Sequence, residues 1–302
     1  MNQQVKSHLA LLGTNIIYGL NYVIAKGIMP DYLMPRAIIF LRVSVTVFIF
    51  WILHLIIPSE KVEKRDFFKL AICAVFGVAF NQILFFEGLN LSTPINASII
   101  ITVIPVVILI FSHLFLKEKI TSIKIFGIIL GATGALLVIL SSGNGDFGSG
   151  TMLGDFMIFV NSVSWALYLV LIKPLMEKYN SITIMKWIFT FGLIIIFPFT
   201  FKSFSASTFS SIPSHIWMSI SFVVFGATII AYFLNNYSLK TVSASVNGIY
   251  IYLQPLVASI AAILFGKDHL TLIKTIAAIM IMTGVFFVTR RNKVNNPALP
   301  FS

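Results

Sequence analysis

Residues 105–134, PVVILIFSHLFLKEKITSIKIFGIILGATG, return in altered form 150 positions later as residues 255–284, PLVASIAAILFGKDHLTLIKTIAAIMIMTG. The pairs matched at this shift are Pro105 with Pro255, Phe115 with Phe265, Lys117 with Lys267, Glu118 with Asp268, Thr121 with Thr271, Lys124 with Lys274, and Thr133-Gly134 with Thr283-Gly284. Shifts of 147 and 149 match Tyr18-Gly19 with Trp165-Ala166, Lys26 with Lys173, and Phe76-Gly77 with Phe225-Gly226. Self-similarity of this kind indicates an internal repeat, which predicts two related halves, residues 1–145 and 146–302.

The composition identifies the environment in which these halves fold. Hydrophobic residues make up 58% of the 302 residues and charged residues only 10%. Soluble domains are about 45–50% apolar and about 25% charged, so a soluble globular protein is excluded. A disordered chain is excluded as well, because it needs low hydrophobicity and high net charge. What remains is an integral membrane protein.

Long apolar runs separated by charged or Gly/Pro/Ser-rich breaks predict the helices of this membrane protein. A spanning helix needs about 20 predominantly apolar residues, and the chain holds ten such runs. The predicted spans are residues 8–26, 35–57, 68–90, 95–116, 123–141, 152–174, 183–201, 215–238, 243–265 and 272–289.

The positions of the basic residues give the predicted topology. The formal net charge is +11, from 21 Lys and Arg against 10 Asp and Glu. With both termini in the cytoplasm, 15 basic residues fall on the cytoplasmic side, five fall outside, and Arg42 lies within a span. This bias fits the positive-inside rule and predicts a multi-pass protein of the inner (plasma) membrane. The short basic clusters indicate topology rather than nucleic-acid binding, and the run after Lys6 is expected to be an uncleaved first span.

Each half contains five predicted spans, which is an odd number, so the second half enters the membrane upside down relative to the first. The fold class is therefore an all-α membrane protein of ten transmembrane helices, built as two inverted five-helix repeats. Inverted repeats are typical of secondary transporters, whose substrate site lies near the midplane between the halves.

Several short motifs resemble the EamA type of the drug/metabolite transporter superfamily. They are Tyr18-Gly19 with Lys26, Trp165-Ala166 with Lys173, Leu41-Arg42, Pro105 with Leu116-Lys117-Glu118, Phe265-Gly266-Lys267-Asp268 with Asp where Glu is usual, and the Thr-Gly pairs. The resemblance implies a metabolite exporter or exchanger with a cavity lined by the first, third, fourth, sixth, eighth and ninth helices. It does not name a solute.

Polar residues spaced along one helix face predict the cavity walls. Amide and aromatic residues recur at i, i+3 and i+7 in three spans, which places them on one face of each helix. Amides hold polar groups, and rings offer stacking and cation–π contacts. The alternative is that these groups join helix to helix; their recurrence in repeat-related spans favours the cavity. The predicted cavity residues are Asn15, Tyr18, Tyr22, Asn81, Asn161, Trp165, Tyr168, Asn235, Asn247, Tyr250 and Gln254.

Pro105 and Pro255 lie in the middle of predicted spans at repeat-equivalent positions. A proline there removes a backbone hydrogen bond and kinks the helix. Paired interruptions in corresponding helices point to a transporter binding site, so we expect both kinks to border the cavity. A kink that serves packing alone is the alternative.

Two charged residues fall within predicted spans and are candidates for ion coupling or gating. Glu87 is a candidate for proton coupling; alternatively it lies close enough to the outer end of its helix to reach water or Arg36. Arg42 is positioned to neutralise a substrate carboxylate, although a structural partner is favoured because the second helix of the resembled family does not usually line the cavity.

Enzymatic motifs are missing from the sequence. It contains no His-Glu-x-x-His, and Gly143-Asn144-Gly145 links the halves without the preceding strand of a nucleotide loop. No cofactor, metal or nucleic-acid partner is predicted. We therefore expect a gradient-driven carrier of small organic metabolites within the lipid bilayer, with amino acids or related amphipathic compounds favoured. A lipid-linked-sugar or nucleotide-sugar carrier is the alternative, and a membrane enzyme or receptor is less favoured; the oligomeric state is left open.

Overall fold

The computed structural model describes residues 3–56, 60–116, 121–141, 150–242, 244–268 and 270–289, and every regular element in these ranges is helical. Three features of the sequence analysis lie outside the described residues. They are the boundary between the halves at residue 145, the repeat residues Lys117 and Glu118, and the basic residues after the last span, Arg290, Arg291 and Lys293.

The first half contains five spans, of which three are single helices and two are built from segments joined end to end. Its elements are α1 (Gln3–Ile28), α2 (Pro35–Ile56), α3 (Lys64–Ala74), the π-helical segment η1 (Val75–Ala79), α4 (Phe80–Leu91), α5 (Pro94–Ile101), α6 (Ile104–Leu116) and α7 (Ser122–Ser141). The third span is α3, η1 and α4 in continuous succession, and the fourth is α5 and α6.

The second half repeats this order. Its elements are α8 (Met152–Lys178), α9 (Ser181–Ser205), a 3₁₀ turn (Phe209–Ser211), α10 (Ser214–Ser221), the π-helical segment η3 (Phe222–Ile230), α11 (Ala231–Ser238), α12 (Ala244–Tyr250), α13 (Leu253–Leu264) and α14 (Leu272–Thr289). Eight spans are long and apolar enough to cross a membrane, and α7 and α14 carry the shorter apolar stretches 125–134 and 272–284. The ten predicted transmembrane helices are confirmed.

Polar caps and prolines begin several of these helices where the predicted breaks lie. Thr93 caps α5 by accepting the Asn96 amide at 3.2 Å, with Pro94 in the first helical position. Thr151 caps α8 and Asn180 caps α9 in the same way. Each cap satisfies one of the amides that a helix start leaves unpaired, which explains why the apolar runs divide at these points.

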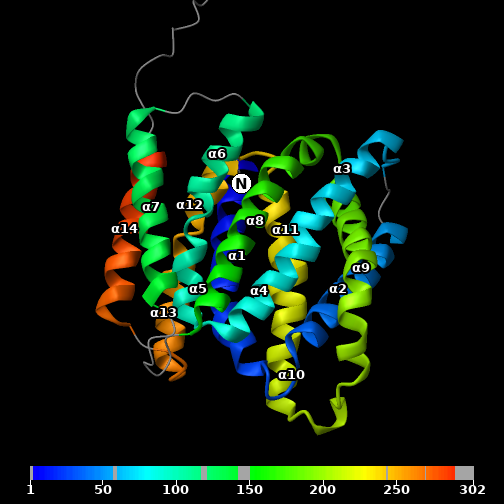
Figure 1. Ribbon diagram of the computed structural model, residues 1–302. Helices are drawn as coiled ribbons and strands as arrows, with labels where there is room; N and C mark the ends of the chain where they lie inside the picture. The colour runs from blue at the N-terminus through cyan, green and yellow to red at the C-terminus, as the bar shows by residue number, and fades with distance from the viewer. Residues whose placement is uncertain are drawn as a thin grey trace, which may run out of the picture.

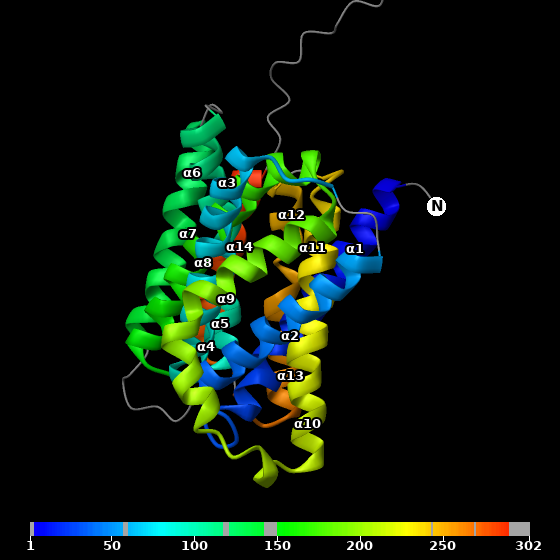
Figure 2. The same cartoon turned by 90° about the vertical axis from the view of Figure 1, so that its right-hand side faces the viewer.

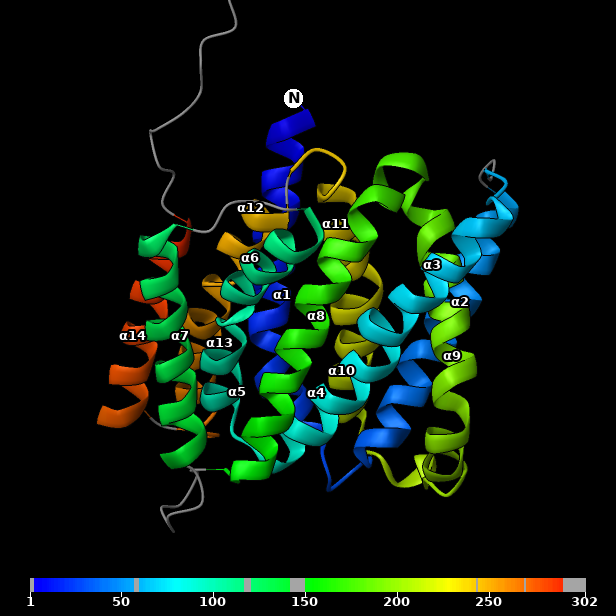
Figure 3. The ribbon, with the colours of Figure 1, turned by 45° about the horizontal axis from the view of Figure 1, so that its top comes forward.

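The contacts between helices stay the same when each helix is replaced by its counterpart in the other half. α4 packs against α8 as α11 packs against α1, and α6 packs against α8 as α13 packs against α1. The self-paired contacts are α7 with α14 at one edge of the molecule and α2 with α9 at the other (Figure 3). This is the contact pattern of two repeats related by a two-fold axis through the centre of the bundle.

The repeats are inverted. α7 and α14 lie side by side and run in opposite directions, although they occupy corresponding places in their halves (Figure 1). The start of α1 and the end of α14 lie on the same side of the bundle, as an even number of spans requires (Figures 1 and 2). Large apolar side chains such as Leu55, Met218 and Leu264 are exposed on its outer surface, as expected for contact with lipid.

The fourth and ninth spans are both broken, as the prolines predict. Thr102 and Val103 separate α5 from α6 just before Pro105, and residues 251–252 separate α12 from α13 just before Pro255. A proline offers no amide to the carbonyl four residues earlier, so the helix opens on its N-terminal side. Both interruptions end within three residues of the prolines at which kinks are predicted.

The third and eighth spans each contain a π-helical segment that the sequence analysis does not predict. Segment η1 surrounds Gly77, and η3 surrounds its repeat equivalent Gly226. A π segment inserts a residue into the helix and is often found at functional sites. Gly77 also allows a close approach, because a Cβ there would lie 2.7 Å from the Cε2 of Tyr168 on α8.

Candidate functional site

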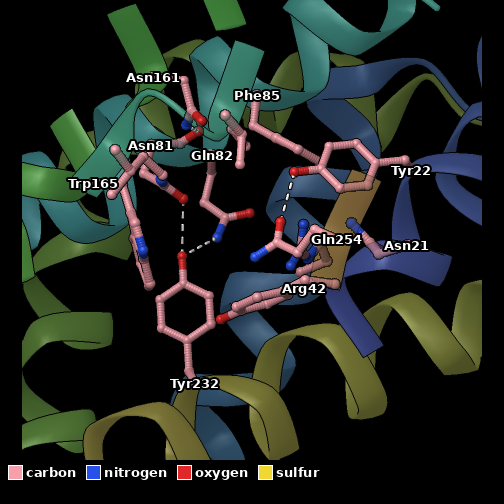
Figure 4. A pocket seen from close by; sticks show the side chains of 13 residues that line it. Asn21, Tyr22, Arg42, Asn81, Gln82, Phe85, Asn161, Trp165, Tyr232 and Gln254 are labelled. Carbon is pink, nitrogen blue, oxygen red and sulfur yellow. Dashed lines mark hydrogen bonds between the residues drawn. The ribbon is translucent and has the colours of Figure 1, made fainter. Parts of the chain in front are cut away.

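A cavity lies at the centre of the bundle, where the two repeats meet (Figure 4). About 480 Å³ of empty space lies between its walls, a figure that includes open solvent at the mouth. Both halves line it, from spans one to four and six, eight and nine. The lining residues are Tyr18, Asn21, Tyr22, Arg42, Asn81, Gln82, Phe85, Ile101, Ile104, Asn161, Trp165, Tyr232 and Gln254.

Tyr232 on α11 ties the eighth span to the third. Its hydroxyl lies 3.0 Å from the carbonyl oxygen of Gly77 and 2.9 Å from Oδ1 of Asn81, and it accepts a hydrogen bond from Nε2 of Gln82 at 2.8 Å. The π segment thus places one of its carbonyl groups where the opposite half can bind it. Figure 4 shows the side chains of Tyr232, Asn81 and Gln82 converging on one edge of the cavity.

A second chain of hydrogen bonds joins the first span to the ninth. The Tyr22 hydroxyl donates to Oε1 of Gln254 at 2.8 Å, and Nε2 of Gln254 donates to Oδ1 of Asn15 at 2.7 Å. Asn15 in turn donates to the carbonyl of Leu11, one turn earlier. Gln254 directly precedes Pro255, so the break in the ninth span positions an amide on the cavity wall.

Aromatic rings form another wall. The rings of Tyr18, Trp165 and Tyr232 meet edge to face, with interplanar angles of 79° to 90° and centroids 5.2 to 6.4 Å apart. Nearby, Asn161 on α8 donates to the Asn81 carbonyl at 2.8 Å, which fixes α8 against α4. Rings from both halves therefore surround a space that suits an apolar or aromatic group.

Arg42 lies on the cavity although it belongs to the second span, and it is only 3% exposed. Its Nε donates to Oγ1 of Thr228 at 2.6 Å, and its guanidinium carbon lies 4.4 Å from the centre of the Phe86 ring. Thr228 belongs to the π segment of the eighth span. Arg42 therefore has the structural partner that the sequence analysis favours, and it also lines the cavity.

Seven of the predicted residues meet at the cavity: Tyr18, Tyr22, Arg42, Asn81, Asn161, Trp165 and Gln254. The other predicted amides and aromatics lie outside its lining and hydrogen-bond to other side chains. Asn15 binds Gln254, Tyr168 binds Asn236, Asn235 binds Asn247, and the Tyr250 hydroxyl lies 2.8 Å from Nδ1 of His8. Pro105 and Pro255 do not line the cavity themselves; their neighbours Ile104 and Gln254 do.

Glu87 also lies outside the cavity lining. One of its oxygens is 2.7 Å from Nε of Arg36 in a partly exposed ion pair. This is the alternative contact that the position of Glu87 near its helix end allows. This carboxylate is therefore paired with a cation rather than placed on the wall of the cavity.

Four lining residues have no counterpart among the predicted ones: Asn21, Phe85, Ile101 and Ile104. Two more lining residues, Gln82 and Tyr232, are polar groups of the third and eighth spans. The sequence does carry a signal for this last pair, because the shift of 149 that matches Phe76-Gly77 with Phe225-Gly226 brings Gln82 to Ala231, the neighbour of Tyr232. Equivalent positions near a two-fold axis lie close to each other, and here Gln82 is hydrogen-bonded to Tyr232, one position from its own counterpart.

Comparison with known proteins places the chain in a family. Residues 5–140 and 152–290 match the EamA-like transporter family. The uncharacterized transporter YyaM of Bacillus subtilis (strain 168) is 28% identical over 289 residues, which cover 92% of each chain. An uncharacterized transporter of Archaeoglobus fulgidus is 25% identical and covers 95% of this chain and 98% of its own.

The fold recurs in a solved crystal structure that is 16% identical, with a TM-score of 0.65 and coverage of 94% of this chain and 98% of the other. The family match spans both halves and the relatives align over nearly their full length. The two five-helix repeats observed here are the two matched segments. The chain is a membrane transporter that belongs to the EamA-like transporter family.

Proposed function

We propose that the protein is a secondary active exporter of small organic metabolites, with amino acids or related amphipathic compounds favoured. It works by alternating access, in which the two halves rock about the central cavity. It resides in the inner (plasma) membrane with both termini in the cytoplasm, a topology supported by the distribution of basic residues. A gradient of the solute or of an ion such as the proton drives transport.

The cavity itself carries this proposal. Polar and aromatic side chains from both repeats converge at the centre of an otherwise apolar bundle, and polar groups within a membrane are costly unless they face protein, water or a ligand. Their placement on the repeat interface is the arrangement that alternating access requires. The broken fourth and ninth spans adjoin it on either side of the two-fold axis.

The alternatives receive less support from the same residues. A carrier of nucleotide sugars or lipid-linked sugars needs several cations for its phosphates, and Arg42 is the single basic residue among the described residues that line the cavity. A membrane enzyme or receptor would form product or signal without moving a solute. A transporter rather than an enzyme is also what the names of the relatives suggest.

Flux measurements test the proposal. Purified protein in proteoliposomes is given pooled amino acids and organic acids with and without a pH gradient. We expect solute flux that falls at least tenfold in Tyr18→Ala and Asn161→Ala, because both remove a wall of the cavity. Tyr32→Phe, which changes an exposed ring in the connection between α1 and α2, is the control and keeps the wild-type rate. Equal flux in all four proteins would contradict the assignment of the cavity.

A further inference from the structure

Arg42 has donors that no group in the described part of the chain uses. A guanidinium group carries five N–H donors, and the hydrogen bond to Thr228 engages Nε alone. Phe86 covers one face of the group. Among the described residues neither terminal nitrogen donates a hydrogen bond, and both belong to a side chain that lines the cavity. These donors are available to a molecule in the cavity.

The positive charge of Arg42 also has no counterion among the described residues. Acidic groups buried elsewhere in the described residues bind other partners: Asp66 binds Lys69 and Lys178, and Asp268 binds Lys274. Glu87 binds Arg36, and Asp155 binds Asn96. No ion pair joins Arg42 to a carboxylate in the part of the chain that the structure describes. An unpaired buried cation is strongly unfavourable, and within a membrane such a residue marks a substrate path.

Unpaired polar atoms in the same cavity place a second requirement on the solute. Oδ1 of Asn21, Oε1 of Gln82 and the Tyr18 hydroxyl are buried and have no hydrogen-bond partner within the described residues. All three side chains line the cavity. The two amide oxygens accept hydrogen bonds, so their natural complement is a ligand O–H or N–H group. Leaving such atoms unpaired costs free energy, which a bound solute recovers.

We propose that the solute is a small organic acid with a net charge of −1. Its carboxylate binds the terminal nitrogens of Arg42, and a hydroxyl or amine group donates to Asn21 and Gln82. Its apolar part packs between the rings of Tyr18, Trp165 and Tyr232. This inference rests on the proposed transport function. Within the solutes proposed there it selects amphipathic organic acids over zwitterionic amino acids, because only a monoanion makes the loaded cavity electrically neutral. A zwitterion or a neutral compound leaves the charge of Arg42 in place.

Matched acids and amides test the charge requirement. Isothermal titration calorimetry on the purified wild-type protein measures the binding of lactate, 3-phenyllactate and phenylalanine. The amides of lactate and of 3-phenyllactate are measured for comparison. We expect each acid to bind at least tenfold more tightly than its amide, the effect of a charge-assisted hydrogen bond. Phenyllactate should bind more tightly than phenylalanine, which has the same ring but no net charge.

Three variants test whether Arg42 causes the preference for acids over amides. Arg42→Gln should abolish the difference between acid and amide, whereas Arg42→Lys, which keeps the charge, should retain part of it. Arg65→Gln changes an exposed arginine and should behave as wild type. Size-exclusion profiles confirm that each variant is folded. An acid preference that persists in Arg42→Gln, or amides that bind as well as acids to the wild type, would overturn the inference.

Flux measurements distinguish failure of the monoanion inference from failure of the proposed transport function. Proteoliposome flux of the amides or of phenylalanine without flux of the acids would refute the monoanion assignment and leave a transporter with another solute. Absence of flux for every acid, amide and pooled amino acid, from protein shown to be folded and inserted, would count against both proposals.

Discussion

Tyr232 and Gln82 show how single residues near the two-fold axis connect the halves. They belong to the repeat-related third and eighth spans, one position from exact equivalence, and Nε2 of Gln82 donates to the hydroxyl of Tyr232. Tyr18 and Trp165, separated by the shift of 147, likewise meet edge to face. A residue close to the axis contacts its own counterpart, so the internal alignment of the sequence holds pair information that periodicity within one helix does not.

Tyr232→Phe removes a hydroxyl that has one donor and two acceptors around it. We expect a stability loss of about 1–3 kcal/mol, because the variant leaves buried partners unpaired, and lower flux, because α4 and α11 lose their contact beside the cavity. Thermal melting and proteoliposome flux check these two effects. Tyr237→Phe, on the same helix, loses only an exposed hydrogen bond with Gln3 and serves as the control; an equal effect in both variants would contradict the role of Tyr232.

At the scale of elements, the sequence predicts interruptions that have a chemical cause. Pro105 and Pro255 lack the amide that a continuous helix needs, so both breaks could be predicted. The π segments around Gly77 and Gly226 could not, since their residues are apolar and suited to an ordinary helix. These segments depend on tertiary contacts, such as the hydroxyl of Tyr232 on Gly77 and Arg42 on Thr228.

The dependence on tertiary contacts also explains which cavity residues the sequence could predict. Helix periodicity puts Asn15, Tyr18 and Tyr22 on one face, but it cannot say which end of that face another helix covers. Gln254 covers Asn15 while Tyr18 lines the cavity. Asn247 and Asn235 have the right chemistry and bind each other instead. The spacing predicts a polar face, and the packing of neighbouring helices decides which part of it meets a solute.

The packing of α7 against α14 gives an element-scale prediction. A Cβ added at Gly284 would lie 2.6 Å from the carbonyl oxygen of Gly127 and 2.7 Å from the amide nitrogen of Gly131. Small residues allow such close approach between membrane helices. Because backbone atoms cannot yield without moving a helix, we expect Gly284→Ala to destabilise the protein by about 1–3 kcal/mol, seen as a lower melting temperature.

Gly27→Ala is the matched control, because nothing lies within 4 Å of a Cβ at that position in α1. Replacing an unhindered helical glycine by alanine is favourable by up to about 1 kcal/mol. We therefore expect its melting temperature to equal or exceed that of the wild type. Equal losses in the two variants would show that the close approach of α7 and α14 is not what destabilises Gly284→Ala.

At the scale of the whole molecule, the inverted repeat accounts for most of what could be predicted. The odd number of spans in each half, the internal match and the basic residues together predict ten helices and their inversion, and the observed contacts exchange as the repeat requires. The repeat also places equivalent residues at opposite faces of the membrane. This property bears directly on alternating access, because a contact that closes one face has a counterpart that closes the other.

Lys26 and Lys173 are such counterparts. Nζ of Lys26 donates to the carbonyls of Leu89 and Asn90, at 3.0 and 2.6 Å, and Nζ of Lys173 donates to the carbonyl of Leu239 at 2.5 Å. Each lysine thus binds the C-terminal end of the third or eighth span, where a cation is favoured. The two contacts lie at opposite ends of the bundle (Figure 1).

Alternating access requires these two ends to open in turn, so removing one lysine should favour opening at its own face. We expect Lys26→Met to increase amide hydrogen exchange near residues 86–91, and Lys173→Met to increase it near residues 235–240, in each case with protection gained at the opposite end. Hydrogen–deuterium exchange measured by mass spectrometry checks both changes, with Lys202→Met as the control, an exposed lysine in the last turn of α9. A gain of exchange at both ends in either variant would indicate general loosening of the bundle and would contradict the proposed alternation.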